Sequence, residues 1–430
     1  MPAAGSSWGR YPRARQEIAQ LHWRDTTLPL GERSMLPYGN GRSYGDVCLN
    51  DGGTLLATRG LDRYIDFDAE HGLLRCEAGV LFSEILDLIV PRGWFLPVTP
   101  GTRYVTVGGA IANDVHGKNH HRAGTFGEHV QRFELLRSDG SRLECSRTRN
   151  AELFGATIAG LGLTGLITWA EFSLQRIAGP WMATDTRRFG NLDEFFSLSA
   201  EAERDHDYAV AWVDCAARKS LGRGVFISAN HAPAGVSAKT PRKGVLAVPF
   251  TPPISLINSL SLNAFNELYF NRARTGHAID HYAPYFYPLD AIGEWNRIYG
   301  PRGFLQYQCV VPPAHARETT RALLERIAAS GSGSFLSVLK VFGDRPPAGL
   351  LSFARAGTTL ALDFPNHGAE TFSLLDRLDD IVAAAGGAVY PAKDARMSGE
   401  RFRTYFPRWQ DMLAHIDPRF SSGFWRRVTA

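Results

Sequence analysis

The sequence has few of the features that mark secreted or membrane-spanning proteins. No window reaches about 18 uninterrupted apolar residues, so we expect no membrane-spanning helix. The opening stretch, MPAAGSSWGRYPRARQ, holds arginines but no apolar core, which predicts no secretory signal. The cysteines are few, odd in number and without a CxxC pair, which argues against a disulfide framework or a zinc ribbon: Cys48, Cys76, Cys145, Cys215 and Cys309. We therefore expect a cytoplasmic protein.

A strong charge of one sign is also missing. The 47 Lys and Arg residues nearly balance the 43 Asp and Glu residues, and the formal net charge is +4. This balance tolerates an anionic ligand but lacks the dense basic stripe of a nucleic-acid-binding protein. The chain has 430 residues, 44% of them hydrophobic, which is too long for one compact core and suits two domains.

The first part of the chain, to about residue 179, alternates short β-like runs with glycine-rich turns. An amphipathic helix is predicted over 81–93, ending at a Pro-Arg-Gly sequence. Residues 138–140, Ser-Asp-Gly, predict a hairpin turn. A short helix over 150–160 precedes a segment, 161–177, that alternates like a strand pair. We expect an α+β region with many strands.

The pattern changes after Pro180. Strand-like runs alternate with a helical pattern over 316–331 and with another that carries Leu374 and Leu378. Strands paired with helices predict a second sheet with helices on one face. Between them, residues 243–266 are apolar but interrupted by prolines, which favours an irregular lid over a core helix.

Three glycine-rich segments fall in the first part of the chain. Residues 160–165, GLGLTG, match GxGxxG, but a helix precedes them and a strand follows, the reverse of a nicotinamide-binding Rossmann site. The other two are YGNGRSYGD (38–46) and PGTRYVTVGGAIAND (100–114). Such runs present backbone N–H groups and hydroxyls that can wrap a pyrophosphate without a helix dipole. Each alone is typical of a tight turn, but together they favour a bound dinucleotide.

These segments carry a family resemblance. YGNGRSYGD, PGTRYVTVGGAIANDVHGKNHH, GLGLTGLI, GEWNRIYGPRGFLQYQ and YPAKDAR resemble the vanillyl-alcohol-oxidase (PCMH-type) FAD enzymes, and among them the oxidase subunits of decaprenylphosphoryl-ribose 2′-epimerases. The likeness runs from about Trp8 to the C-terminus. It implies an α+β, two-domain fold in which 1–179 and 389–430 form the FAD domain and 180–388 form a substrate domain.

The resemblance also implies an activity. The enzyme would use FAD to oxidise a secondary hydroxyl to a ketone on a polyprenyl-phosphate-linked pentose, as the first half of an epimerisation in cell-wall arabinan synthesis. A separate NAD(P)H-dependent reductase would complete it, since this chain offers no Rossmann unit. The amphiphilic substrate would bring the protein into peripheral contact with the inner face of the cell membrane. There, residues 243–266 would lie against the bilayer or shield the lipid chain.

The implied cofactor site gathers the three glycine-rich segments and the late YPAKDAR segment. Its residues are Gly41, Arg42, Ser43, Tyr44, Gly45, Gly101, Thr102, Gly108, Gly109, Ala110, Asn113, His116, Gly162, Ile167, Tyr390 and Lys393. Several members of the wider fold attach FAD covalently through a histidine in the GRSYGD-type loop. This loop has no histidine, and we therefore predict non-covalent FAD.

Four of the thirteen histidines fall in DVHGKNHHRAGTFGEHV (114–130), which raises the question of a metal site. His116 and His120 are four residues apart, but nearby glycines interrupt a helix and no carboxylate or cysteine pair completes a ligand set. We therefore predict no metal. The resemblance implies instead that His116 faces the flavin and the sugar, where neutral imidazole can take the hydroxyl proton. A structural histidine bonded to a backbone carbonyl is the alternative, and the favoured reading for His120, His121 and His129.

Lys393 and Tyr44 complete the implied catalytic set with His116. Lys393 would place a cation beside the reduced flavin and the substrate, with Tyr390 from the same segment; the alternative is a solvated surface lysine. The implied substrate contacts are Lys118, Trp212, Gln308 and Lys340, where the lysines suit a phosphate and the amide a sugar hydroxyl. From the sequence alone, Trp212 and Gln308 are equally typical of half-buried strand residues.

Two positions depart from the family pattern. Ala361 stands where some relatives carry cysteine, and Phe286 stands where relatives can carry tyrosine. Both changes affect the expected substrate more than the expected chemistry. Two other functions stay open: a soluble sugar-alcohol or aldonolactone oxidase that uses oxygen, and a non-catalytic flavin-binding module.

Overall fold

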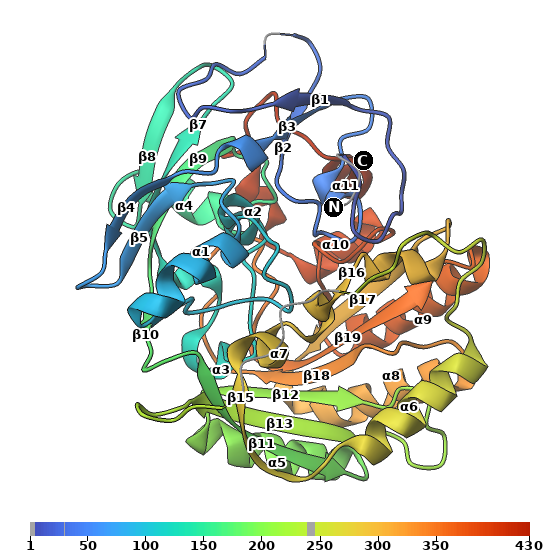
Figure 1. The fold of residues 1–430 in the computed structure, drawn as a ribbon. Coiled ribbons are helices and arrows are strands. Elements are labelled where there is room, and N and C mark those ends of the chain that lie inside the picture. Colours follow the sequence, from blue (N-terminus) through green and yellow to red (C-terminus); the bar gives the residue numbers. More distant parts are fainter. Residues whose placement is uncertain (1–4, 30, 239–245) are drawn as a thin grey trace.

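The computed structural model describes residues 5–29, 31–238 and 246–430. In the upper body of Figure 1, β3 (Thr54–Ala57) pairs in parallel with β1 (Glu17–Gln20) and β2 (Met35–Tyr38). Beside it lies a five-stranded antiparallel sheet in the order β4-β5-β9-β7-β8. Its strands are β4 (Tyr64–Asp68), β5 (Leu73–Glu77), β7 (Val130–Leu136), β8 (Arg142–Ser146) and β9 (Leu166–Ser173).

Four helices accompany these sheets: α1 (Phe82–Ile89), α2 (Val107–Ala112), α3 (His120–Ala123) and α4 (Ala151–Thr157). The predicted helix after residue 81 is α1, which buries Phe82, Ile85, Leu86 and Ile89. The predicted hairpin turn joins β7 to β8. Helix α4 precedes the GLGLTG segment and β9 follows it, which confirms the reversed order that excludes a Rossmann site. The segment expected to form a strand pair instead forms the long strand β9 and the two-residue strand β10 (Gln175–Arg176), which do not pair with each other. Strand β10 pairs with β6 (Trp94–Phe95).

An eight-stranded antiparallel sheet forms the lower body of Figure 1, in the order β15-β11-β13-β12-β18-β19-β17-β20. Its strands are β11 (Trp181–Phe189), β12 (Tyr208–Val213), β13 (Gly224–His231), β15 (Gly276–His281), β17 (Phe304–Val311), β18 (Ser337–Phe342), β19 (Gly357–Pro365) and β20 (Ala388–Val389). A small parallel pair, β14 (Leu246–Ala247) with β16 (Ile292–Gly293), lies outside it.

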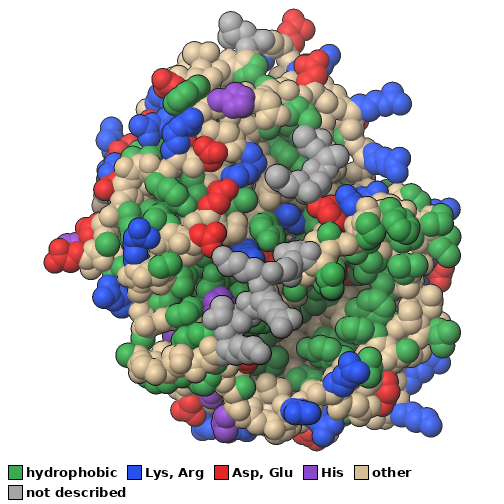
Figure 2. All heavy atoms as spheres, viewed as in Figure 1, with side chains coloured by type: hydrophobic (Ala, Val, Ile, Leu, Met, Phe, Trp, Pro, Cys, Tyr) green, Lys and Arg blue, Asp and Glu red, His purple; other side chains and the backbone are tan. Residues whose placement is uncertain are grey.

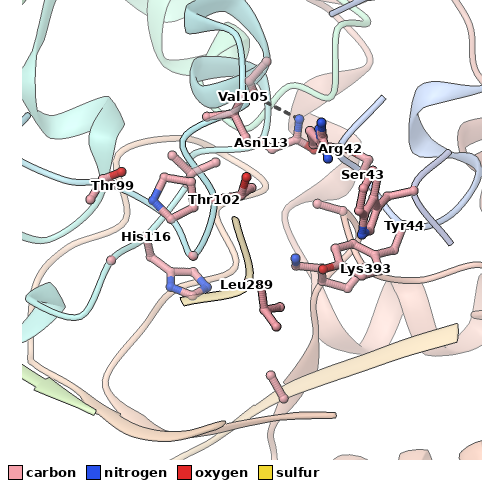
Figure 3. A pocket seen from close by; sticks show the side chains of 18 of the residues that line it. Arg42, Ser43, Tyr44, Thr99, Thr102, Val105, Asn113, His116, Leu289 and Lys393 are labelled. Carbon is pink, nitrogen blue, oxygen red and sulfur yellow. Dashed lines mark hydrogen bonds between the residues drawn. The ribbon is translucent and has the colours of Figure 1, made fainter. Parts of the chain in front are cut away.

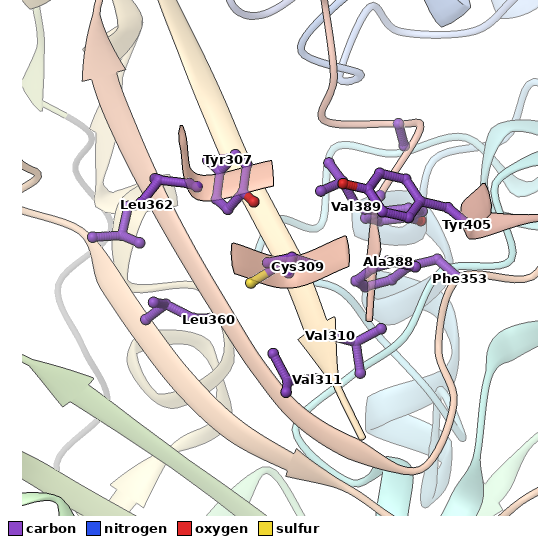
Figure 4. Packing of buried hydrophobic residues seen from close by; sticks show 14 of the residues in the cluster. Tyr307, Cys309, Val310, Val311, Phe353, Leu360, Leu362, Ala388, Val389 and Tyr405 are labelled. Carbon is purple, nitrogen blue, oxygen red and sulfur yellow. The ribbon is translucent and has the colours of Figure 1, made fainter. Parts of the chain in front are cut away.

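The two faces of this sheet differ in character. One face packs on α5 (Leu192–Asp205), α8 (Ala316–Ser330) and α9 (Ala369–Ala384) in one apolar cluster. Figure 4 shows part of this cluster, from Leu360 and Leu362 of β19 to Tyr405. Because side chains alternate along a strand, the intervening residues point to the other face. That face carries polar groups and α7 (Tyr282–Phe286), and it is the face that borders the cavity described below.

The C-terminal segment returns to the upper body. Helix α11 (Gly423–Thr429) lies beside the N-terminal strands in Figure 1, and α10 (Gly399–Tyr405) lies between α11 and α9 of the lower body. Arg427 of α11 binds Asp46, and it also binds Asp394. Arg419 accepts a hydrogen bond at its carbonyl from the Met35 amide, 2.7 Å away. These contacts join the two ends of the chain into one unit.

Two sequence-based expectations need correction. Residues 243–245 of the expected lid lie outside the described residues, but its last part is helical: α6 (Ser259–Arg272) begins there. Asn258 caps this helix, its side chain accepting hydrogen bonds from two first-turn amides, which stabilises a helix without an amphipathic pattern. The second glycine-rich segment is also not all loop. Its Gly108 and Gly109 lie in the first turn of α2, which Thr106 caps.

Candidate active site

A cavity of about 550 Å³ lies between the glycine-rich segments and the polar face of the eight-stranded sheet (Figure 3). This size is within the usual range for small-molecule sites. Most residues that the sequence analysis singled out line it: Gly41, Arg42, Ser43, Tyr44, Gly101, Thr102, Gly108, Gly109, Asn113, His116, Lys118, Gly162, Ile167, Trp212, Gln308, Lys340, Tyr390 and Lys393. Residues far apart in the chain therefore converge on one space.

Gly45 and Ala110 are the two expected cofactor contacts that do not line this cavity. A Cβ on Gly45 would collide with the carbonyl of Asp394, so this glycine allows the first glycine-rich segment to pack against the C-terminal segment. Ala110 is fully buried on the core side of α2. Both residues therefore pack behind the cavity wall and do not line the cavity.

The first glycine-rich segment is fixed by contacts at each side. Gly41 has a φ of +60°, a conformation that favours glycine. Asn40 donates a hydrogen bond to the carbonyl of Tyr104, 2.7 Å away, which ties this segment to the second one. The amide of Tyr44 donates to the carbonyl of Ala392 at 2.9 Å. The segment therefore contacts both the second glycine-rich segment and the C-terminal return.

Arg42 is a half-buried cation at the cavity wall. Its guanidinium stacks 4.1 Å from the ring centroid of Trp8 and 5.3 Å from that of Tyr104. Burial lowers the pKa of Arg42. Its Nε has no hydrogen-bond partner, and it forms no ion pair with the described part of the chain. A half-buried guanidinium without an ion pair among the described residues favours an anionic ligand.

Asn113 presents a second unpartnered group. Its Nδ2 donates to the carbonyl of Gly109 at 2.9 Å, while its buried Oδ1 has no partner among the described residues. The hydroxyl of Tyr390 donates to the Asn113 carbonyl at 2.7 Å, so the C-terminal segment holds this turn. The glycines that line the cavity, the Asn113 acceptor and the Arg42 guanidinium, the last two unpaired within the described residues, fit a bound nucleotide such as FAD.

His116 lies between two side chains from the sheet. Its Nε2 is 3.0 Å from Nε2 of Gln308, and its Nδ1 is 3.4 Å from Nζ of Lys340. Phe342 packs edge-on against the ring at 4.8 Å. Burial, and next the positive charge of Lys340, hold the pKa of His116 well below its ordinary value, so the ring is neutral. Since both nitrogens have protein partners, a substrate hydroxyl must replace one of them to give its proton to His116.

Two lysines, Lys340 and Lys118, lie in the same part of the cavity. Lys340 also donates to the carbonyl of Gly117 at 3.1 Å, and Lys118 donates to the carbonyl of Tyr285 and lies 4.3 Å from that ring centroid. Burial lowers the pKa of each lysine to about 7, and their mutual repulsion adds to this for Lys118. Neither forms an ion pair with the residues that the structure describes. Two desolvated ammonium groups without a carboxylate partner are suited to bind a phosphate.

Lys393 lies across the cavity from His116, beside Tyr44 (Figure 3). Its Nζ is 3.9 Å from the Tyr44 ring centroid, a cation–π contact. Burial lowers the pKa of Lys393, and the negative charge of Asp363 raises it in part. Asp363 is fully buried, accepts a hydrogen bond from Gln306 at 2.6 Å, and has one oxygen without a partner. Lys393 is therefore not the solvated surface lysine of the alternative reading.

The sheet face supplies a row of side chains opposite the glycine-rich segments. Trp212, Val338, Ala361 and Gln308 stand side by side on four neighbouring strands and all line the cavity. Ala361 thus leaves space in the middle of this row. Phe286 also lines the cavity, and the adjacent Tyr285 has a buried hydroxyl without a partner in the described chain. Both departures from the family pattern therefore lie at the cavity.

The remaining histidines of this segment have structural surroundings. His121 and His129 approach the backbone carbonyls of His206 and Ala123 at 3.0 and 2.8 Å. His120 packs on Phe342 with ring centroids 4.6 Å apart. Within the described ranges, no three His, Cys, Asp or Glu side chains gather as a metal site would require.

Several residues of this region were not predicted from the sequence. Gln306 and Thr359 line the cavity two residues before Gln308 and Ala361 on their strands, and Asp363 stands two residues after Ala361. The alternation of a strand was a sufficient signal for all three. Asp290, which accepts a hydrogen bond from the Arg103 amide at 2.9 Å, lies in a single-turn 3-10 helix (Pro288–Ala291) that gave no such signal.

Comparisons with known proteins agree with these observations. The family description "FAD binding domain" matches residues 31–146. The chain is 36% identical over 416 residues to decaprenylphosphoryl-beta-D-ribose oxidase of Mycolicibacterium smegmatis. The aligned region covers 93% of this chain and 90% of that protein. The chain is also 35% identical over 375 residues to an uncharacterized protein in the mprA 5′ region of Streptomyces coelicolor, covering 81% of this chain and 100% of that protein. Similarity to L-gulonolactone oxidase of Mus musculus is 31% over 131 residues, 30% of this chain and 29% of that protein.

Proposed function

Because the chain belongs to the FAD-linked oxidoreductase family of decaprenylphosphoryl-β-D-ribose oxidase, we propose that it oxidises a secondary hydroxyl of a polyprenyl-phosphate-linked pentose to a ketone. The α+β vanillyl-alcohol-oxidase fold, the FAD cofactor and the oxidoreductase class expected from the sequence are confirmed. The observation that carries the substrate proposal is the pair Lys118 and Lys340, two half-buried cations that line the cavity without a carboxylate partner among the described residues. Lys340 lies beside His116.

FAD, when bound, supplies the electron acceptor for the oxidation of the alcohol. We propose that residues 1–179 and 389–430 hold it and that 180–388 bind the substrate. Arg42 and Asn113 support this placement, because each offers a buried polar atom that lacks a partner within the described chain. The absence of histidine from the segment 38–46 supports non-covalent attachment.

The sugar and its phosphate would lie against the sheet face. Lys118 and Lys340 bind the phosphate oxygens, Gln308 bonds a sugar hydroxyl, and Trp212 packs on an apolar surface of the substrate. The neutral ring of His116 accepts the hydroxyl proton once the substrate replaces one of its present partners. Lys393, held beside Tyr44, keeps a positive charge at the opposite wall.

The product ketone requires a second enzyme to complete an epimerisation. We propose a separate NAD(P)H-dependent reductase as the functional partner, in cell-wall arabinan synthesis. The amphiphilic substrate supports peripheral contact with the inner face of the cell membrane. Among the described helices, none is long and apolar enough to cross a bilayer.

The second candidate is a soluble sugar-alcohol or aldonolactone oxidase. Its support is the similarity to L-gulonolactone oxidases, which extends over 30% to 37% of the chain. A small neutral polyol has no group that would pair with Lys118 and Lys340. The lipid-phosphate substrate accounts for these residues, and the polyol does not.

The test is anaerobic mixing of the FAD-loaded protein with synthetic prenylphosphoryl-ribose, followed by the flavin absorbance at about 450 nm. Bleaching by this compound, with none by the same prenyl ribose lacking phosphate, would support the proposal. Bleaching by free polyols alone would favour the soluble oxidase. His116→Ala that retains FAD but does not bleach would exclude a non-catalytic flavin module.

A further inference from the structure

Most of the exposed large apolar side chains in the described part of the chain lie between Leu246 and Tyr269. Leu246 and Leu260 are 83% and 80% exposed, and Ile254 is 72% exposed. Figure 2 shows apolar side chains gathered on the right-hand side of the molecule, where α6 and the segment before it lie. A contiguous exposed apolar surface of this kind marks an interaction site. We call the exposed apolar side chains of residues 246–269 the α6 surface.

Helix α6 is fixed to the molecule by a narrow inner side. Leu262 and Asn266, one turn apart, are its buried residues. Asn266 donates to a carboxylate oxygen of Asp214 at 2.7 Å, and Arg223 bridges Asp214 and Glu267. These polar contacts set the orientation of the helix. The outward-facing apolar residues, such as Leu260 and Leu268, therefore do not result from a loosely placed helix.

The α6 surface is continuous with the active-site cavity. Trp212, on the cavity wall, contacts Tyr269 with ring centroids 4.7 Å apart, and Tyr269 also lines the cavity. Tyr269 stacks on Phe265 at 5.9 Å, and Phe265 contacts Phe335 at 4.7 Å. Consecutive aromatic contacts thus lead from Trp212, in the row of cavity-lining side chains on the sheet, to the exposed helix α6.

The charged side chains within residues 246–275 are mainly basic. Between residues 246 and 275 the only carboxylate is Glu267, and Arg223 pairs with it at 2.5 Å. Arg272 and Arg274, at the end of the helix, are exposed and form no ion pair with the described residues. An apolar surface with unpaired arginines at its edge is complementary to an anionic membrane interface.

We propose that the α6 surface docks onto an anionic lipid bilayer, with the cavity mouth turned toward the lipid along the path from Phe265 to Trp212. This inference rests on the proposed function and specifies the surface through which a membrane-held substrate reaches the cavity. The continuity with the cavity favours a bilayer over a second copy of the chain, because a lipid-linked sugar must enter from the membrane while its chain stays there. A second copy would instead cover the cavity mouth.

The test is flotation of the FAD-loaded protein with phosphatidylcholine vesicles, with and without about 30% phosphatidylglycerol. This fraction of anionic lipid gives the vesicles a clearly negative surface potential. The wild type is expected to bind the anionic vesicles. Leu268→Ser should weaken binding about tenfold, or about 1.4 kcal/mol, because this leucine is half exposed and can bury further apolar surface in the bilayer. Leu260→Ser/Leu268→Ser should abolish binding. Leu413→Ser is the matched control, because Leu413 and Leu268 are each 50% exposed and Leu413 lies outside the α6 surface.

Three results would overturn the proposal: no vesicle binding by the wild type, equal loss for Leu413→Ser, or self-association that the leucine variants abolish. Turnover of a water-soluble, short-chain prenylphosphoryl-ribose is measured on the same preparations. If the wild type does not turn over this compound, the proposed function is contradicted. Vesicle binding is measured without substrate, so its result does not depend on that activity. Failure of one can therefore be told from failure of the other.

Discussion

Lys340→Met should weaken the binding of a phosphate-bearing substrate and at the same time stabilise the protein. Lys340 is a half-buried cation that lies beside His116 and donates to the carbonyl of Gly117. If it binds the substrate phosphate, its loss removes a charge-assisted hydrogen bond worth about 1.5–3 kcal/mol. This corresponds to an increase in KM of about 10- to 150-fold. Because methionine has a similar length and no charge, the cavity wall keeps its shape.

The gain in stability follows from the same burial. Lowering the pKa of a lysine from 10.5 to about 7 corresponds to at most about 4 kcal/mol at pH 7. We reduce this to about 2 kcal/mol because the ammonium faces a cavity that water can enter. The lost hydrogen bond to Gly117 offsets about 1 kcal/mol. The net gain of about 1 kcal/mol should raise the melting temperature by about 1 °C in a chain of this length.

The pH dependence gives the sign of this effect. The unfolded chain protonates Lys340 more readily than the folded protein does, so the wild type gains stability as pH rises from about 7 toward 10.5. The advantage of Lys340→Met should therefore be largest near pH 7 and shrink toward pH 10. Steady-state kinetics and thermal unfolding across this range measure both effects, with Lys219→Met, an exposed lysine outside the cavity, as the control. An unchanged KM, or an equal rise for a substrate without phosphate, would refute the phosphate assignment; a lower melting temperature at pH 7 would refute the electrostatic reasoning.

Three further outcomes are expected. Lys393→Met should lower kcat by about 10²- to 10³-fold, as for the loss of one preorganised charge at a reaction centre, while absorbance shows that FAD is retained; loss of FAD would assign Lys393 to binding instead. Asp363→Asn removes the negative charge that raises the pKa of Lys393, so the alkaline limb of the kcat/KM profile should move to lower pH, and a limb that stays in place would contradict the pairing. Acid precipitation should leave the flavin in the supernatant, and colour in the pellet would show a covalent link.

Local patterns predicted the regular elements well. The helices at α8 and α9, the β7–β8 hairpin and the strands of the second sheet each have a periodicity that is complete within one segment. Helix α6 was missed because its apolar residues surround the axis, which gives no amphipathic period. Its signal was the cap: Asn258 accepts hydrogen bonds from the amides of Leu260 and Ser261 at 3.0 Å each.

The residues that line the cavity could be predicted from the sequence, but their protonation states could not. The family resemblance brought His116, Lys118, Lys340 and Lys393 together as candidates. It did not indicate that Asp363, far from Lys393 along the chain, would lie close enough to act on its pKa. Strand alternation places Asp363 on the face of Ala361, yet the distance to a later loop depends on how the C-terminal segment returns. Such long-range approaches are a property of the tertiary structure and have no local pattern.

The lysines also show why this site is better explained by an anionic ligand than by stability. Lys118 and Lys340 repel each other, lack ion pairs within the described chain, and titrate near pH 7 because of burial. A fold that needed only a stable core would place apolar side chains at these two positions, as buried charge replacements in other proteins show. A phosphate that entered between them would raise both pKa values and remove the repulsion. The substrate would thus complete an electrostatic arrangement that the polypeptide leaves unbalanced, and its binding would stabilise the folded protein.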